Sequence, residues 1–399
     1  MRKIPEIALS RTVIALAPMV MGLALAMDIY IPAVPHIADI FHASAGKMQL
    51  TLTLFMLIAG LMQLIVGPLA DQFGRKILSF VAITIFALGT LLCSSAHSIY
   101  ELVSYRIIQA IGSAGMLVVS FAIVRDLYHG GKSAQAYSYL NGVISFSPMF
   151  APFIGSYLDI RFGWPSTFLA LLITAALAWI ALSILLPESL PTNRRQKITV
   201  HIFQGYRDIF SNQLFFYYTL AAAMGLSYLY LFCSISPYVI IRLLHIPESH
   251  YGFYFAFMGV SFFIGSFLSG FTVAKIGIYH TVVLGFFITL IGGIIMTIWY
   301  VITGLTINNF IWPMLLIGIG GTFCMGAGTG GAMEPFGETA GAASALGGAT
   351  RFAFSAIVGS VVITSKVSST LPLAIPAVLF SLLGISLFLP LHKRLAICQ

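Results

Sequence analysis

Residues 51–76 read TLTLFMLIAGLMQLIVGPLADQFGRK. The first nineteen of these residues carry no charge and are mostly apolar. A helix needs about 20 such residues to cross the hydrocarbon of a membrane, because each residue adds only about 1.5 Å to its length. The run then ends in a short polar segment from Asp71 to Lys76. We therefore predict a membrane-spanning helix at 47–69, followed by a polar loop.

The same pattern recurs along the whole chain. Of its 399 residues, 59% are hydrophobic and 8% are charged, whereas soluble domains carry about 25% charged residues. A soluble fold of this size would lack a charged surface, which indicates that most of the surface faces lipid. At about 33 residues for each span and its loop, the chain has room for about twelve spans. The predicted spans are 12–34, 47–69, 77–95, 99–123, 135–157, 165–186, 214–241, 251–273, 279–302, 310–332, 340–364 and 371–391.

The longest polar gap between these spans divides them six and six. It runs from Pro187 to Asn212. We therefore expect an N-terminal six-helix half at 1–190, a cytoplasmic linker at 191–212 and a C-terminal six-helix half at 213–399.

Two short segments recur in both halves at nearly the same offset. GPLADQFG at 67–74 is echoed 203 residues later by GFTVAKIG at 270–277, and IYIPAV at 29–34 is echoed 205 residues later by SISPYV at 234–239. Transporters built from such parallel repeats bind their substrates near the middle of the membrane. The sequence thus predicts an all-α polytopic membrane protein with twelve transmembrane helices in two six-helix pseudo-repeats.

The distribution of lysine and arginine indicates how the chain is oriented in the membrane. If the N-terminus is cytoplasmic, fourteen lysines and arginines fall on the cytoplasmic side and four on the other side, while Arg106 and Arg351 lie inside spans. Cytoplasmic loops carry the excess of lysine and arginine. We therefore expect a multi-pass protein of the bacterial inner membrane with both termini in the cytoplasm. The net charge of +8 then reflects topology, and we expect no nucleic-acid partner.

The sequence also limits the energy source and the cofactors. The four cysteines are scattered without a CxxC pair, and the histidines are too loosely spaced for a ligand set, so we expect no metal and no other cofactor. There is no GxxxxGK[ST] phosphate loop and no soluble domain to hydrolyse ATP. A proton moving across the membrane releases about 2.3 kcal/mol per 100 mV, which makes proton coupling the economical drive.

Asp28 and Arg106 are the predicted proton-coupling residues. Asp28 is the only acid clearly inside a predicted span of the first half. A charged aspartate at the bilayer centre costs about 2.5–3.5 kcal/mol on insertion scales. Burial disfavours the charged carboxylate and a nearby arginine favours it, so such a group can exchange a proton as a cavity opens and closes. The alternatives are that Asp28 is a structural partner of Arg106 at the outer interface, and that Arg106 extends to that interface.

The charged residues inside the predicted spans indicate which substrates the cavity would accept. One acid faces two intramembrane arginines, Arg106 and Arg351, so the cavity should suit neutral or anionic substrates better than cations. The alternative for Arg351 is a structural bond to a backbone carbonyl or helix end. The residues assigned to this cavity are Tyr30, Gln109, Asn141 and Arg351.

Two further segments carry predicted mechanical roles. In the loop after the second span, two glycines permit close packing and a tight turn, and three charged residues form a network that can close the cytoplasmic face. The glycines are Gly67 and Gly74, and the charged residues are Asp71, Arg75 and Lys76. The alternative is a turn that only sets topology.

The fifth predicted span contains SPMFAPFIGS at 147–156, in which Pro148, Pro152 and Gly155 stand among small residues. Small residues let helices approach closely, and proline kinks a helix. The alternative is an ordinary kinked packing helix.

These segments resemble known patterns of the major facilitator superfamily. The loop at 67–76 resembles its G-x-L-a-D-r-x-G-r-k motif, with Gln72 in place of a basic residue. RIIQAIG at 106–112 resembles its R-x-x-Q-G-x-G element, with Ala110 in place of a glycine. The segment at 147–156 is similar to the antiporter motif g-x-x-x-G-P-x-x-G-G, in which only Pro152 and Gly155 match by identity.

Two other segments resemble one branch of that superfamily, the Bcr/CflA bicyclomycin-resistance drug exporters. They are DIYIPAVP at 28–35 and GAASALGGATRF at 341–352. The resemblance implies the major facilitator fold and a proton-driven antiporter for multidrug efflux and antibiotic resistance, working by alternating access. We expect a monomer in the lipid bilayer whose partners are protons and a small-molecule substrate.

Three other functions remain to be weighed. A major-facilitator uptake symporter, or a dedicated metabolite or siderophore transporter, would share the fold and Asp28. An intramembrane enzyme would need a clustered nucleophile, paired acids or an HExxH motif, and the sequence contains none. A scaffold protein would not need a buried aspartate. We therefore predict a transporter and not an enzyme.

Overall fold

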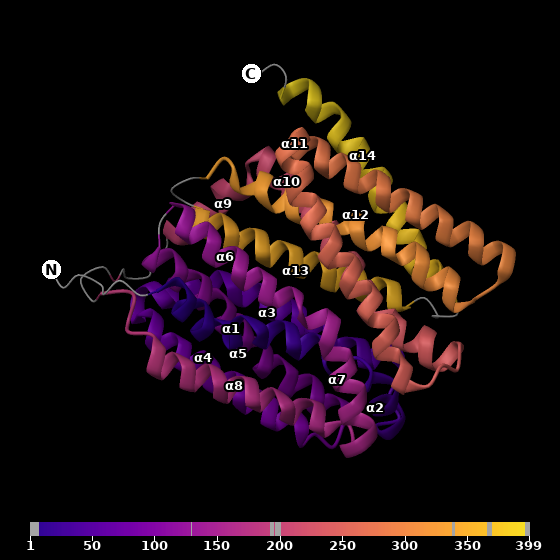
Figure 1. Cartoon of the computed structure of the whole chain (residues 1–399), viewed down its shortest axis with the longest axis horizontal. Coiled ribbons are helices and arrows are strands. Elements are labelled where there is room, and N and C mark those ends of the chain that lie inside the picture. Colours follow the sequence, from indigo (N-terminus) through magenta and orange to yellow (C-terminus); the bar gives the residue numbers. More distant parts are fainter. Residues whose placement is uncertain are drawn as a thin grey trace. The chain divides into compact units, whose positions relative to one another are not determined.

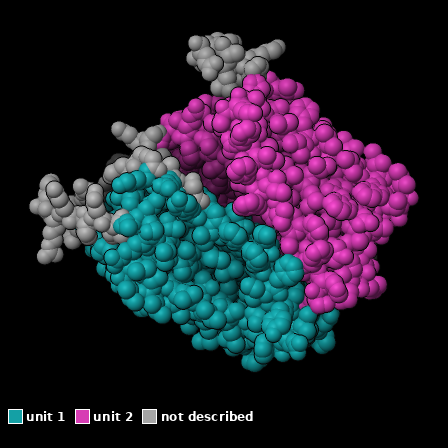
Figure 2. All heavy atoms as spheres, viewed as in Figure 1, with its two compact units in different colours: residues 1–202 teal, residues 203–399 magenta. Residues whose placement is uncertain are grey.

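The computed structural model describes residues 8–128, 130–191, 195, 201–336, 340–364 and 369–395. Nearly all residues in these ranges lie in helices, and none lies in a β strand. The chain separates into two compact units, Met1–Ile202 and Phe203–Gln399, which Figure 2 shows in teal and magenta. Residues 192–194 and 196–200 of the predicted linker at 191–212 lie outside the described ranges.

Unit 1 is a bundle of side-by-side helices (Figure 1). The helix α5 packs on α1, α3 and α4, and α8 packs on α1 and α4. Serine caps fix two starts, since Ser44 accepts a hydrogen bond from the Lys47 amide and Ser98 accepts one from the Glu101 amide. Its helices are α1 (Leu9–Asp28), α2 (Val34–Ile40), α3 (Ala45–Phe73), α4 (Arg75–Ser94), α5 (Ile99–Leu127), α6 (Gly130–Ser145), α7 (Ser147–Phe162) and α8 (Pro165–Leu185).

Unit 2 follows a short helix, α9 (His201–Phe210), which straddles the unit boundary. In this unit α12 packs on α10 and α11, α13 packs on α10, and α14 packs on α11. The Asn212 side chain caps the start of α10, and Thr306 and Asn309 form a reciprocal capping box at the start of α12. Its elements are α10 (Gln213–Pro237), a π-helix (Tyr238–Leu243), α11 (Glu248–Thr303), α12 (Ile307–Met333), α13 (Ala340–Thr364) and α14 (Leu371–Leu395).

Eleven helical stretches of the described chain are long and apolar enough to cross a membrane. One of them, α11, has 56 residues and breaks at Gly277, where φ is 80°. The parts before and after Gly277 correspond to the predicted spans at 251–273 and 279–302, and each is long enough to cross the membrane once. The stretch from Gln135 to Phe162, which contains most of α6 and all of α7, counts as one crossing. The prediction of an all-helical protein with twelve transmembrane helices is confirmed.

Apolar side chains cover the outside of the helices, as a lipid-facing surface requires. Along α8, Ile173, Leu177, Ile180 and Ile184 are each more than half exposed. Soluble monomers rarely expose continuous apolar patches of this kind.

The first predicted span is corrected at its end. It was expected to run from 12 to 34, but α1 ends at Asp28 and a separate short helix, α2, begins at Val34. The segment between them contains Pro32, and Pro35 occupies the first turn of α2. Proline lacks the amide donor that a continuing helix needs. Asp28 is therefore the last residue of α1, beside a turn.

Candidate functional site

The most deeply buried charge in unit 1 is Arg106 on α5, which has no exposed surface. Its Nη1 donates to the Ala26 carbonyl oxygen at 2.7 Å and to Gln109 Oε1 at 2.7 Å. Its guanidinium carbon lies 4.4 Å from the Tyr30 ring centre and 4.1 Å from the Phe55 ring centre. Aromatic faces attract such a cation. The alternative in which Arg106 extends to the outer interface is therefore wrong.

Polar neighbours fix the arrangement around Arg106. Gln109 lies one turn further along α5 and donates to Thr90 Oγ1 at 2.9 Å. The Tyr30 hydroxyl lies 2.8 Å from Thr51 Oγ1. Nε and Nη2 of Arg106 are buried and have no hydrogen-bond partner among the described residues. The guanidinium thus keeps unused donors in a site that is already closed to water.

Asp28 is buried near this cluster but does not form an ion pair with Arg106 in the described structure. Its carboxylate instead accepts a hydrogen bond of 2.8 Å from Ser147 Oγ, at the start of α7. The expected direct tie is absent because Arg106 takes the carbonyl of Ala26, two residues earlier on α1. Positions two apart on a helix do not face the same way.

The residues of the predicted antiporter motif bring α7 against the end of α1. Pro148 lies in the first turn of α7 and Pro152 lies inside it. A Cβ atom on Gly155 would overlap the Ile29 carbonyl oxygen, so only glycine fits at this crossing. Together with the bond from Ser147 to Asp28, this contact holds α7 beside the carboxylate.

The loop between α3 and α4 is closed by charges around Arg75, whose side chain is 2% exposed. Arg75 pairs with Asp71 and donates from Nε to Asp126 Oδ2 at 2.8 Å. Asp126 is the penultimate residue of α5. The predicted charge network therefore ties α3, α4 and α5 together.

Glu188, in the segment after α8, completes this network. Its two carboxylate oxygens accept hydrogen bonds from the backbone amides of Arg75 and Lys76, at 3.0 and 3.1 Å. These amides open α4, where the helix dipole favours an anion. Lys76 Nζ donates in turn to the Leu186 carbonyl oxygen at 2.7 Å, and Arg195 lies 3.8 Å from Glu188. The segment that leaves α8 is thus fastened to the loop.

The two glycines of this loop differ. Gly74 has φ 99° and ψ 150°, a region reserved for glycine, and a Cβ there would lie 2.6 Å from the Arg195 side chain and 2.7 Å from Glu188. Around Gly67, by contrast, a Cβ would meet nothing within 4 Å. The expectation of close packing is wrong for Gly67, while the expected tight turn lies at Gly74.

Sequence reasoning missed three acids of unit 1. Asp126 and Glu188 lie just outside predicted spans. Both are close in sequence to basic loop residues, and this could have indicated that they belong to a charge network. Asp159 was placed beyond the predicted span at 135–157, but α7 continues to Phe162 and leaves Asp159 4% exposed. Its Oδ1 lies 2.9 Å from His36 Nδ1. Asp28 is therefore not the only buried acid of this unit.

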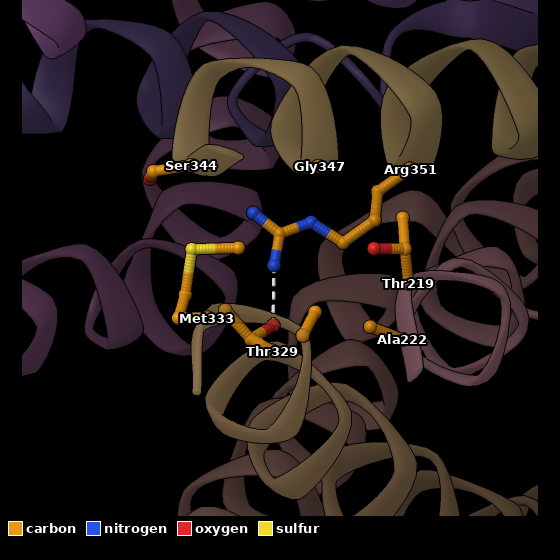
Figure 3. Close-up of a pocket in the computed structure, with 8 residues that line it drawn as sticks. Thr219, Ala222, Thr329, Met333, Ser344, Gly347 and Arg351 are labelled. Atoms are coloured by element: carbon orange, nitrogen blue, oxygen red, sulfur yellow. Dashed lines mark hydrogen bonds between the residues drawn. The ribbon is translucent and has the colours of Figure 1, made fainter. Parts of the chain in front are cut away.

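Arg351 belongs to unit 2, where it lies in a small pocket (Figure 3). It hydrogen-bonds the Thr329 hydroxyl, so the expected alternative of a backbone carbonyl as its partner is not found. The pocket has room for about one water-sized group. The residues that line it come from α10, α12 and α13 and are Thr219, Ala222, Thr329, Ala332, Met333, Ser344, Gly347 and Arg351.

Of the four residues assigned to a substrate cavity, three belong to unit 1 and Arg351 belongs to unit 2. Tyr30 and Gln109 lie beside Arg106, and Arg351 lies in the pocket of unit 2. Asn141 is exposed on α6, where its backbone carbonyl accepts a bond from Ser145. No group of three or more histidine, cysteine, aspartate or glutamate residues in the described part of the chain could hold a metal ion.

Comparison with solved structures agrees with the fold. A bacterial homologue of the human lysosomal transporter Spinster superposes on 95% of this chain and 96% of its own length, with a TM-score of 0.72 and 17% sequence identity. The same protein in a second, occupied form gives a TM-score of 0.71.

Relatives in sequence carry names that refer to drug resistance. The chloramphenicol resistance protein of Pseudomonas aeruginosa is 28% identical, over 85% of this chain and 80% of the relative. The bicyclomycin resistance protein homolog of Haemophilus influenzae is 27% identical, over 87% of each chain. Multidrug resistance protein D of Escherichia coli is 27% identical, over 93% of each chain.

These names match the bicyclomycin-resistance branch that the motifs resemble, so that prediction is confirmed. The family model for the Major Facilitator Superfamily matches residues 16–360, which include eleven of the twelve predicted spans in whole or in part. With this match and the helical architecture above, the chain belongs to the Major Facilitator Superfamily, a family of multi-pass membrane transporters.

Proposed function

We propose that this chain exports small drugs or related small molecules across the bacterial inner membrane, in exchange for protons and by alternating access. The names of its relatives, which refer to chloramphenicol, bicyclomycin and multidrug resistance, support export of this substrate class. The uptake alternative has no comparable support, because none of these names refers to import. The chain acts as a transporter without enzymatic activity.

One observation carries the proton coupling: unit 1 buries an acid, Asp28 at the end of α1, and an arginine, Arg106, that bonds α1 two residues earlier, without pairing the two charges. Asp28 has its hydrogen bond from Ser147, and Arg106 has two buried nitrogen atoms without partners. Burying unsatisfied charge is costly, so this arrangement is stable only as one state of a cycle. Binding of a proton removes the charge of Asp28. Release of that proton restores a carboxylate anion that Arg106 can attract.

The cycle follows from this exchange of partners. Protonation of Asp28 from the outside lowers the cost of burying its carboxyl group and favours the state that opens to the cytoplasm. A substrate entering from the cytoplasm or the inner leaflet binds beside Tyr30 and Gln109 and favours release of the proton. The direction of export is then set by the inward proton gradient.

The remaining expectations complete the proposal. The halves at 1–190 and 213–399 are the two moving bodies, the segment at 191–212 connects them, and the protein works as a monomer. The network of Asp71, Arg75 and Glu188 holds the cytoplasmic ends of α3, α4 and α8 together until substrate arrives. Both termini lie in the cytoplasm, as the basic residues indicate. Labelling of a terminal cysteine in intact cells by a membrane-impermeant reagent would contradict that orientation.

Everted membrane vesicles test the proposed function. Vesicles with wild-type protein are energised, and the quenching of a pH-sensitive dye is recorded while chloramphenicol and other neutral drugs are added. We expect drug addition to dissipate the proton gradient in wild-type vesicles and to have no effect with Asp28→Asn. The exposed Asp39 on α2 provides the matched control, since Asp39→Asn makes the same chemical change and should respond like wild type. A full response from Asp28→Asn would rule out Asp28 as the coupling residue.

A further inference from the structure

Unit 2 contains a positive charge, that of Arg351, which no acid in the described part of this unit pairs with. Arg351 lies in the membrane-spanning part of α13, and an ionisable residue there is costly unless it has a partner or a function. The acids in the described part of unit 2 are Asp208, Glu248 and Glu334, and none of them forms an ion pair with Arg351. Glu334, which follows the pocket residue Met333, is exposed at the end of α12.

The guanidinium of Arg351 still has donors to offer. It has five N–H groups, and its one hydrogen bond to the described residues joins Nη1 to the Thr329 hydroxyl. That hydroxyl donates to the Met325 carbonyl of its own helix. Figure 3 shows the guanidinium extending into the space between Thr329, Met333 and Ser344. The arginine is thus held in place at one nitrogen atom while the others face the pocket.

A second group in the pocket is also unsatisfied. Thr219 on α10 is 3% exposed, and its hydroxyl has no hydrogen-bond partner in the described structure. Buried threonines elsewhere in unit 2, such as Thr289 and Thr322, donate to carbonyl groups of their own helices. The Thr219 hydroxyl instead turns toward the Arg351 side chain (Figure 3). Buried polar groups are almost always satisfied, so the unpartnered Thr219 hydroxyl beside the guanidinium of Arg351 indicates a place for a further polar group in this pocket.

We propose that the pocket of Arg351 and Thr219 is a subsite for an anionic or strongly polarised oxygen group of the transported molecule, such as a carboxylate. This inference rests on the proposed export function and adds a substrate class to it. Arginine presents parallel N–H donors that match the two oxygens of a carboxylate. The Thr219 hydroxyl offers a third donor from the other side.

The size of the pocket indicates what part of a substrate it holds. In this structure its enclosed space has room for about one water-sized group, far less than a pocket that encloses a whole drug-sized ligand. The apolar side chains of Ala222, Ala332 and Met333 line the rest of its wall. The pocket therefore takes only the oxygen end of an acidic group, and the remainder of the molecule lies outside it.

A pair of fluorescent probes of the same shape tests this assignment. Coumarin-3-carboxylate carries the anionic group, and coumarin-3-carboxamide replaces it with a neutral one. Both are titrated against the purified full-length protein in lipid nanodiscs at neutral pH. We expect the wild-type protein to bind the carboxylate about tenfold or more tightly than the carboxamide, as hydrogen bonds to a charged group predict.

Substitutions in the pocket test whether Arg351 and Thr219 cause the preference for the carboxylate probe. Arg351→Gln should weaken carboxylate binding about tenfold or more while leaving carboxamide binding nearly unchanged. Arg351→Lys should retain part of the preference because it keeps the charge. Thr219→Val is close to wild type in shape and should reduce the preference severalfold. Thr350→Val is the matched control: Thr350 neighbours Arg351, and its hydroxyl bonds the Leu346 carbonyl of its own helix.

The outcomes separate this inference from the proposed function. Equal affinity of the wild-type protein for the two probes, or an unchanged preference in Arg351→Gln, would overturn the subsite. If Arg351→Gln does not fold, an unchanged preference for the carboxylate in Thr219→Val would also overturn the subsite. Coupled export of a neutral drug in the vesicle test is independent of either result. Replacing sodium chloride by sucrose should leave the preference in place, and a preference that disappears as chloride is raised would assign the pocket to a free inorganic anion instead.

Discussion

The three buried ionic residues on which the account depends are each held in a different way. Arg106 is held by a backbone carbonyl and two aromatic rings, Asp28 by a single serine, and Arg351 by a single threonine. All three keep unused capacity for hydrogen bonds or charge. The identities of these residues were predictable from the sequence because charge is rare in apolar runs. Their partners were not, because Ala26, Ser147 and Thr329 are ordinary residues until the helices cross.

The two glycines of the loop between α3 and α4 give a prediction at this scale. Gly74→Ala places a side chain in a backbone region open almost only to glycine, and against Arg195 and Glu188. We expect it to lower the free energy of unfolding by about 1–3 kcal/mol and to reduce export. Gly67→Ala adds a methyl group in open space and should match wild type in both respects.

Thermal unfolding of the two purified variants, followed by drug-resistance assays in cells, checks this prediction. Equal stability of Gly74→Ala and wild type would show that the turn tolerates a side chain. A defect in Gly67→Ala would mean that this glycine serves a contact formed in another state of the cycle.

At the scale of elements, the sequence predicted where helices lie better than where they stop. Apolar runs of sufficient length located the spans, and the polar loops divided them correctly. The end of α1 was missed because residues 29–34 remain apolar, while Pro32 and Pro35 remove the amide donors that a helix needs. The burial of Asp159 was missed because α7 extends five residues beyond its predicted end, to Phe162.

The crossing of α1 and α7 gives the second mutational prediction. Gly155→Ala would force the Ile29 carbonyl away, and with it the turn that follows Asp28. Overpacking of this kind costs about 1–3 kcal/mol, so we expect a lower unfolding temperature and weaker proton-coupled export. Gly142→Ala on α6 meets no neighbour within 4 Å and is the matched control.

The comparison is made on purified protein for stability and on everted vesicles for coupling. If Gly155→Ala couples drug and proton as well as wild type does, the close contact between α7 and α1 has no role in holding Asp28. In that case the antiporter motif would be an ordinary packing helix.

For the whole molecule, composition was the strongest predictor. A share of 8% charged residues in 399 left no surface for water, and the gap after Pro187 divided the chain into two sets of six spans. The faces of the predicted site residues were less predictable: Asn141 is exposed on α6, and Arg351 lines a pocket of unit 2. A residue's depth along a span can be read from the sequence, but the face it presents depends on how the helices pack.

The central claim is that Asp28 couples drug export to proton entry. Purified wild-type protein and Asp28→Asn are reconstituted into proteoliposomes, and two rates of radiolabelled chloramphenicol transport are measured: accumulation driven by an imposed pH gradient, and drug-for-drug exchange without a gradient. The account predicts that Asp28→Asn loses the first rate and keeps the second, because the carboxamide can neither bind nor release the proton. If Asp28→Asn still accumulates drug in response to the pH gradient, the coupling residue lies elsewhere and the central claim is wrong.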